Sequence, residues 1–260
     1  MNRILRRSRL LPLGLVLAAL LLPLSASAQD LPTARQVLDD FVEAVGGREA
    51  LTRHESVHTV GKFSVPGQGI EGGLEVWSAV PDRMLLRVEI PGLGEIRSGY
   101  DGTTGWTINP MTGPQLVEGK ELEQLRAQAD FYRNLYPAED YTSMKVLEKA
   151  DFGGRPAYKM ELVRTTGVTT TEYFDVETKL LLGMEMEQET PMGPVPVTLR
   201  MEDYEDFEGF RIATRTVMEM MGMEQIMTVE SVEYDNLEPD TFAPPESIQA
   251  LLEEAPAEGD

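Results

Sequence analysis

Cysteine is absent from this 260-residue chain, histidine occurs only twice, and acidic residues outnumber basic ones by 44 to 23. Without cysteine the fold cannot depend on disulfides, and thiolate nucleophiles, cysteine metal sites and a cysteine-linked lipid anchor are all excluded. The formal net charge of −21 opposes contact with nucleic acids and with anionic lipid surfaces, while it favours solubility. The composition therefore excludes nucleic acid as a partner.

Motifs for common catalytic sites are also missing: the chain has no nucleophile elbow, His-Glu-x-x-His motif, phosphate-binding loop or EF-hand pattern. Residues 67–72 match the dinucleotide pattern G-x-G-x-x-G, but a strand rather than a helix is predicted to follow. His54 and His58 have no partners at ligand spacing, and we expect them at the surface or at a strand edge. The acidic run at residues 202–208 could hold calcium, although a solvated turn is favoured. We predict no enzyme activity, no cofactor and no metal.

Residues 1–28 have the pattern of an export signal. Four arginines within the first nine residues precede an apolar run at residues 10–24, and Ala-Ser-Ala at residues 26–28 suits a cleavage site. The run contains two prolines and is shorter than the roughly 20 residues that span a bilayer, so cleavage is favoured over an anchor helix. The pair Arg6-Arg7 leaves a twin-arginine route open beside general secretion. We expect a periplasmic chain that starts at Gln29 and has a formal charge of −25, since the leader holds four arginines and no acidic residue.

Two amphipathic helices are predicted. Thr33 and Gln36 form a capping-box pattern, apolar residues then recur at helical spacing, and Gly46-Gly47 ends the helix, with one more turn expected at residues 48–51. The second helix is predicted over residues 118–136, where apolar residues recur every three to four positions. Its broad aromatic face should cover the sheet, either as an ordinary core helix or as a mobile lid. A short helix and an acidic tail are expected at residues 246–260.

Strands account for most of the remaining chain. In the stretch at residues 74–110, Met84, Leu86, Val88 and Ile90 alternate with other residues and share one face, and the Asp101-Gly102 turn is typical of a hairpin. Residues 111–119 are assigned to a loop. Later strands are predicted near residues 144–150, 155–165, 168–175, 179–188, 195–204, 210–221 and 223–235. About a dozen consecutive strands indicate one mainly β domain (α+β), an antiparallel sheet curled into a barrel or part of one.

Methionine is frequent, with 14 residues, and five of them lie between Met218 and Met227. On strand alternation most methionines share a face with other apolar residues, as Met201 does with Leu199. Because methionine side chains are flexible and polarisable, this pattern favours core packing or the lining of an adaptable cavity. A copper(I) site stays open as an alternative at Met221 and Met223, since thioethers select that ion.

Several of these motifs resemble the periplasmic lipoprotein-carrier family, the LolA-like proteins. They are Leu74 and Val76 followed by Pro81, then D-G-x-x-x-W-x-x-N-P at residues 101–110, and the closing F-x-P-P at residues 242–245. The resemblance covers Gly73 to Pro245. It implies an incomplete antiparallel β-barrel of about 11–12 strands over residues 29–245, with helices covering a concave apolar face that holds acyl chains. The family's carriers have an arginine before the proline that ends the strand, where this chain has Val80.

Inward apolar residues suit a packed core and a ligand cavity equally well, and the resemblance favours the cavity. We therefore expect a soluble, monomeric LolA-like protein that binds a lipid or an acylated protein and exchanges it with a membrane-bound donor or acceptor. A lipid sensor of the same fold is the alternative, and an enzyme ranks last. The residues expected to line the cavity are Met84, Leu86, Val88, Trp106, Ile108, Phe131, Leu135, Met160, Met184, Met186, Leu199, Met201, Met218 and Met220.

Overall fold

The structure is a computed structural model that describes residues 31–190 and 192–254. The predicted export signal at residues 1–28 and the acidic tail expected at residues 255–260 lie outside the described residues. In chain order the elements are α1 (Ala34–Ala44), α2 (Gly47–Leu51), β1 (Ser56–Val65), β2 (Ile70–Ala79), β3 (Arg83–Ile90), β4 (Gly94–Tyr100), β5 (Gly105–Asn109), β6 (Gly113–Val117), α3 (Gly119–Ala129), the single turns η1 (Arg133–Leu135) and η2 (Ala138–Asp140), β7 (Tyr141–Phe152), β8 (Arg155–Arg164), β9 (Thr169–Asp175), β10 (Leu181–Gln188), β11 (Val195–Phe207), β12 (Phe210–Met220), β13 (Met223–Tyr234) and α4 (Glu246–Glu254).

All 13 described strands belong to one antiparallel sheet in the order β6-β5-β4-β3-β2-β1-β13-β12-β11-β10-β9-β8-β7. Each strand is followed in space by its sequence neighbour, except where β1 pairs with β13 and joins the two halves of the sheet. The outer strands β6 and β7 do not pair with each other, so the sheet is not closed. This arrangement confirms the predicted incomplete antiparallel β-barrel.

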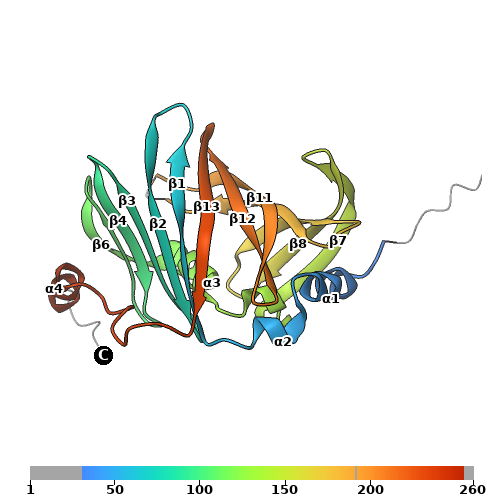
Figure 1. The fold of residues 1–260 in the computed structure, drawn as a ribbon, viewed down its shortest axis with the longest axis horizontal. Coiled ribbons are helices and arrows are strands. Elements are labelled where there is room, and N and C mark those ends of the chain that lie inside the picture. The colour runs from blue at the N-terminus through green and yellow to red at the C-terminus, as the bar shows by residue number, and fades with distance from the viewer. Residues whose placement is uncertain (1–30, 191, 255–260) are drawn as a thin grey trace, which may run out of the picture. The chain divides into compact units, whose positions relative to one another are not determined.

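Strand β6 corrects the assignment of residues 111–119 to a loop. It pairs with β5 from Gly105 opposite Val117 to Asn109 opposite Gly113. Gly113 and Pro114 conceal it in the sequence, but a proline is tolerated in an edge strand because one side of that strand makes no ladder hydrogen bonds. Helix α4 packs beside β6, at the left of Figure 1, and α1 packs against β7 at the other edge. Both exposed edges of the sheet are thereby partly protected from pairing with another chain.

The first helix forms as the sequence predicts. Gln36 N donates to Thr33 Oγ1 at 3.2 Å, and Thr33 N donates to Gln36 Oε1 at 2.9 Å. The two hydrogen bonds together form the capping box. Gly46 has a φ of +126° and lies so close to the β11–β12 turn that a Cβ atom there would be 2.1 Å from the Gly209 carbonyl oxygen. Only glycine can therefore connect α1 to α2 at this point.

The second helix is shorter than predicted, because α3 ends at Ala129 rather than continuing to Tyr136. Asp130 leaves the helical region with ψ 110°, and its side-chain oxygen accepts the Tyr132 N–H at 3.0 Å. The Phe131 N–H then donates to the Pro81 carbonyl at 3.0 Å, so the chain after the helix is fixed to the turn between β2 and β3. Aspartate often ends helices in this way, because its side chain satisfies nearby backbone groups.

Candidate ligand-binding face

One face of the sheet carries apolar residues from strand to strand. Leu86 of β3 lies opposite Val76 of β2, and Phe63 of β1 lies opposite Met227 of β13. Cross-strand partners point to the same side of a sheet, so this face continues without interruption across the β1–β13 junction. We call it the inner face, because α1 and α3 both pack on it.

The same face extends through the second half of the sheet. Leu199 of β11 lies opposite Met184 of β10 on one side and Met218 of β12 on the other. Met184 in turn lies opposite Glu172 of β9, and Glu172 lies opposite Met160 of β8. The inner face of this half is thus rich in methionine, with one buried carboxyl among the apolar side chains.

Two helical segments cover parts of the inner face. Phe41 of α1 makes edge contacts with the rings of Phe174 and Tyr136, at centroid distances of 5.4 and 5.8 Å, within a large core cluster over β7–β10. Helix α3 contributes Leu122 and Leu125 to a smaller cluster over β3, β4 and β6. These two clusters hold the helices on the sheet through apolar burial.

A third cluster on the inner face consists only of strand residues, and we call it the central cluster. Three of its members are buried and six remain half-buried. The members are Phe63, Ile70, Leu74, Val76, Leu86, Val88, Ile90, Ile96 and Met227. Apolar side chains that stay partly exposed on a concave face, beside two helix-covered regions, are available to contact an apolar ligand.

Eleven of the 14 predicted lining residues divide into three groups. Met160 is fully buried and Leu135 is nearly so, both inside the core cluster under α1, so they belong to packed protein rather than to an open surface. Met84 packs with α3, and Met184 and Met201 pack at the margin of the α1 cluster. The residues that remain half-buried outside the helix-covered clusters are Leu86, Met186, Leu199, Met218 and Met220, and Val88 is buried within the central cluster.

The prediction that Trp106 and Ile108 line the cavity is wrong, because the strand register places both residues on the outer face. Trp106 lies opposite Gly99, which neighbours Tyr100 of the α3 cluster in sequence and therefore points the other way. Trp106 is 1% exposed, and a Cβ atom on Gly99 would lie 2.4 Å from its ring. Ile108 lies opposite Arg97 on the same outer face. Alternation within one short strand could not show which of its two faces was the inner one.

Phe131 and Leu135 were predicted to lie in the second helix, but both follow the end of α3 at Ala129. Phe131 is half-buried and its ring makes an edge contact with Tyr132 at a centroid distance of 5.3 Å. Sequence reasoning omitted most of the central cluster, including Phe63, Ile70 and Met227. The strand that holds Met227 was predicted at residues 223–235, but the pairing of β1 with β13 is what brings Met227 beside Phe63.

Gln124 fixes α3 to the opposite half of the sheet. Its side-chain Nε2 donates to the Glu187 carbonyl at 2.6 Å, and its Oε1 accepts from Glu189 N and from Gln188 Nε2, each at 2.9 Å. Gln124 is 6% exposed. The helix thus bridges β3–β6 and the end of β10 through one side chain, which makes Gln124 an anchor for the cover.

An open pocket of about 560 Å³ lies beside this anchor. Met186, one of the predicted lining residues, contributes to its wall together with Gln124, Lys120 and the end of β10. The other wall carries three threonines, Thr166 from the turn between β8 and β9 and Thr169 and Thr171 from β9 itself. The pocket combines hydroxyl and charged groups with an apolar margin, which suits the polar end of an amphiphilic molecule.

Glu172 is the buried carboxyl of the inner face. The Tyr136 hydroxyl donates to it at 2.7 Å and the Thr170 hydroxyl at 3.1 Å. Burial raises the pKa of Glu172, and burial together with the neighbouring carboxyl raises the pKa of Tyr136. The pair holds the η1 segment against the sheet, since Tyr136 lies directly after η1.

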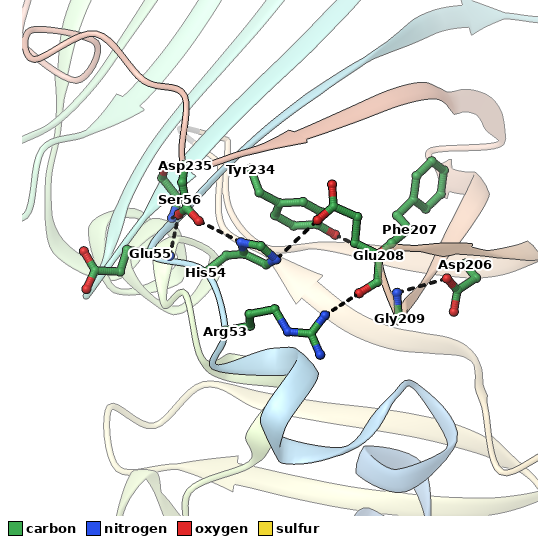
Figure 2. Close-up of polar contacts among 10 residues, drawn as sticks. All are labelled: Arg53, His54, Glu55, Ser56, Asp206, Phe207, Glu208, Gly209, Tyr234 and Asp235. Carbon is green, nitrogen blue, oxygen red and sulfur yellow. Dashed lines mark hydrogen bonds and ion pairs between the residues drawn. The ribbon is translucent and has the colours of Figure 1, made fainter.

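The two histidines take part in structural contacts. His54 Nδ1 lies 2.7 Å from the Asp235 side chain, and the other oxygen of that carboxylate accepts the backbone N–H groups of Glu55 and Ser56. Figure 2 shows the His54 ring between Asp235 and Glu208, whose carboxylate is 3.8 Å from Nε2. The hydrogen bond from His54 lowers the pKa of Asp235. These contacts join the α2–β1 connection to the end of β13.

His58 lies on the outer face, where its ring stacks on Trp77 at a centroid distance of 4.6 Å and its Nε2 lies 3.0 Å from Glu75. Arg87 forms an ion pair with the same glutamate. Within residues 31–190 and 192–254, three or more His, Asp or Glu residues never gather in a geometry that could hold a metal ion. Met221 and Met223, the copper alternative, are exposed at a hairpin tip.

This chain has Val80 where the LolA-like carriers have an arginine. Val80 N donates to the Glu55 carbonyl at 2.9 Å, so this residue ties β2 to the start of β1. Arg83, a possible substitute, donates to the Val80 carbonyl at 3.2 Å and lies over the Phe242 ring at 5.2 Å. Its guanidinium therefore contacts the C-terminal segment, and the connection from sheet to helical cover is made by Gln124 and by the Phe131 backbone instead.

No family model matches the chain, and no curated protein matches it in sequence. Solved structures do match in fold. A DUF1329 family protein from Desulfovibrio piger aligns with 80% of this chain and 96% of its own at 13% identity and a TM-score of 0.56. A LolA superfamily protein from Nitrosomonas europaea aligns with 82% and 99% at 16% identity and a TM-score of 0.55.

A third structure is a Vibrio parahaemolyticus domain assigned provisionally to outer membrane lipoprotein sorting. It aligns with 81% of this chain and 97% of its own at 13% identity and a TM-score of 0.53. Among the described residues, none of the helices is both long and apolar enough to cross a bilayer. The three matches in fold show that the chain has the LolA-like fold that its motifs resemble.

Proposed function

We propose that the inner face binds the acyl chain of a lipid or of an acylated protein, and that the protein is an exported periplasmic carrier. The observation that carries this proposal is the set of half-buried apolar side chains on the inner face outside the two helical covers. They comprise the half-buried members of the central cluster and the methionine-rich row of Met186, Leu199, Met218 and Met220. An acyl chain would remove this surface from water.

The hydrophobic energy that an acyl chain gains on binding is comparable to the cost of association. Each methylene group transferred from water to an apolar surface contributes about 0.8 kcal/mol, so a chain of about 12 carbons gains roughly 10 kcal/mol. Association and ordering cost on the order of 4–15 kcal/mol, so net binding requires a cost in the lower part of that range and would be reversible rather than permanent. Methionine side chains adapt to chains of different length and branching.

The headgroup or linker of the ligand would lie in the polar pocket beside Gln124. Met186 belongs both to this pocket and to the row of inner-face methionines, so a single amphiphile could contact both. The domain from Vibrio parahaemolyticus is assigned provisionally to lipoprotein sorting, which supports exchange of an acylated cargo as the role of this fold. We propose exchange with a membrane-bound donor or acceptor on that basis.

The test is uptake of a fluorescent long-chain fatty acid by the mature protein and its variants. Leu86→Asp and Met186→Asp place a charge on the inner face and should each weaken binding at least tenfold, because a carboxylate there would lie against the chain. Leu147→Asp is the matched control, since Leu147 is an exposed apolar residue of β7. Circular dichroism and a thermal melt establish that each variant is folded. Equal binding by both inner-face variants and the control would refute the proposed site.

A further inference from the structure

The hairpin turns at the strand ends form two edges of the sheet, which differ from the outer strands β6 and β7. Exposed apolar side chains concentrate on one of these two turn edges. Because every neighbouring pair of strands is antiparallel, successive hairpin turns alternate between two edges. The turns after β1, β3, β5, β8, β10 and β12 share one edge, and the turns after β2, β4, β7, β9 and β11 share the other. In Figure 1 the turns after β1, β3 and β12 all reach the top of the view, away from α1 and α2.

Five of the eight large hydrophobic residues that are exposed in the described chain belong to the first of these edges. We call these five the apolar rim. They are Leu93, Met111, Met192, Met221 and Met223, which are 47%, 82%, 85%, 63% and 39% exposed. They come from four different hairpins, so each turn presents only one or two apolar side chains.

The two edges also differ in charge. On the rim edge, the residues between the strands include no charged residue except Glu189, which forms an ion pair with Lys120 at 3.2 Å. On the opposite edge, four of the five turns carry a charge, at Asp82, Asp101, residues 177–179 and Glu208. In a chain with a net charge of −21, turns almost free of charge are a distinct feature of this edge, although the adjoining strand ends carry glutamates such as Glu89 and Glu224.

The central cluster reaches the same edge. Ile70 is the first residue of β2 and Ile90 the last of β3, so these two members of the central cluster adjoin turns of this edge, and the turn after Ile90 carries Leu93 of the rim. A ligand that enters or leaves the central cluster along the strands would therefore pass between the hairpin tips that carry the rim.

We propose that the apolar rim docks the protein on a bilayer surface of zwitterionic lipid, with the methionine and leucine side chains entering the interfacial region. Its apolar groups are spread over separate tips, whereas a protein partner would usually meet a contiguous patch. Flexible methionines suit a disordered interface. The negative charge of the remaining surface opposes approach to anionic lipid, so the uncharged rim is the part that can contact a neutral bilayer. That the docked protein loads or delivers an acyl chain rests on the proposed function.

The experiment is flotation of the mature protein with phosphatidylcholine vesicles. The rim variant combines Met111→Glu, Met192→Glu and Met221→Glu, and it should partition to the vesicles at least tenfold less than the wild type. The control variant combines Leu147→Glu, Leu252→Glu and Thr103→Glu, which adds the same charge at exposed positions outside the rim, and it should bind like the wild type.

Three outcomes would overturn the docking proposal. The first is a wild type that does not bind protein-free vesicles, including one that binds only native membranes, which would indicate a protein partner. The second is a rim variant that binds like the control. The third is stronger binding to vesicles that contain phosphatidylglycerol than to pure phosphatidylcholine. Fatty-acid uptake is measured in parallel. Its retention by the rim variant separates a docking defect from a failure of the ligand site, and its absence from a wild type that docks would refute the proposed function alone.

Discussion

Replacing Gln124 tests whether α3 is fixed to the sheet as described. Gln124→Ala removes three hydrogen bonds, to Glu187, Gln188 and Glu189, from a side chain that is 6% exposed. Each such bond contributes about 0.5–1.5 kcal/mol, and the two backbone groups left behind lie next to an open pocket where water can reach them. We therefore expect the free energy of unfolding to fall by about 2–4 kcal/mol.

Gln128→Ala is the matched control for this experiment, because Gln128 is an exposed residue of the same helix. Both substitutions change helix propensity equally, so the difference between them isolates the anchor. The assay is urea unfolding followed by circular dichroism, with amide exchange of α3 as a local measurement. The Gln124 variant should also show faster exchange throughout α3. A difference below about 0.5 kcal/mol between the two variants, within the range of ordinary surface substitutions, would contradict the anchoring role.

Three other perturbations have expected outcomes. Gly99→Ala should destabilise the protein by about 1–3 kcal/mol in urea unfolding, because the new Cβ would lie 2.4 Å from the Trp106 ring, whereas Gly73→Ala, with no atom within 4 Å, should not. Burial raises the pKa of Glu172, so its contribution to stability is complete below the unfolded value near 4.3 and is lost as the pH rises through the folded pKa. Glu172→Gln should therefore gain stability relative to the wild type between pH 4 and pH 7, and a pH-independent difference would contradict this. The pKa of Asp235 is lowered, so its contribution is present above about pH 3.9 and lost as the pH falls through the folded pKa. Asp235→Asn should consequently have a lower free energy of unfolding than the wild type at pH 7. The difference should shrink as the pH falls, which unfolding measured at each pH would show.

Local pattern was sufficient to predict most elements of this fold. The capping box at Thr33, the hairpin turn at Asp101-Gly102 and the period of two in β3 are short-range signals, and each element formed where it was predicted. The errors lie where a local signal was weak or misleading. Pro114 concealed β6, and Asp130 ended α3 before the apolar spacing did.

The candidate site was less accessible to prediction, because it depends on long-range pairing. Alternation assigned Trp106 to a face with Ile108 but could not decide which face was inner, and the register reversed the assignment. The central cluster requires β1 to pair with β13, and the Gln124 anchor requires α3 to meet the end of β10, 63 residues further along the chain. No periodicity within a single segment carries that information.

Native mass spectrometry of the mature protein, purified from a bacterial periplasm without detergent, tests acyl-chain binding most directly. The account predicts a protein bearing one lipid or fatty acid, which organic extraction removes and incubation with a long-chain fatty acid restores in the wild type but not in Leu86→Asp. A protein that carries no lipid and takes up no fatty acid, while folded, would contradict the account and show that the inner face is a filled core.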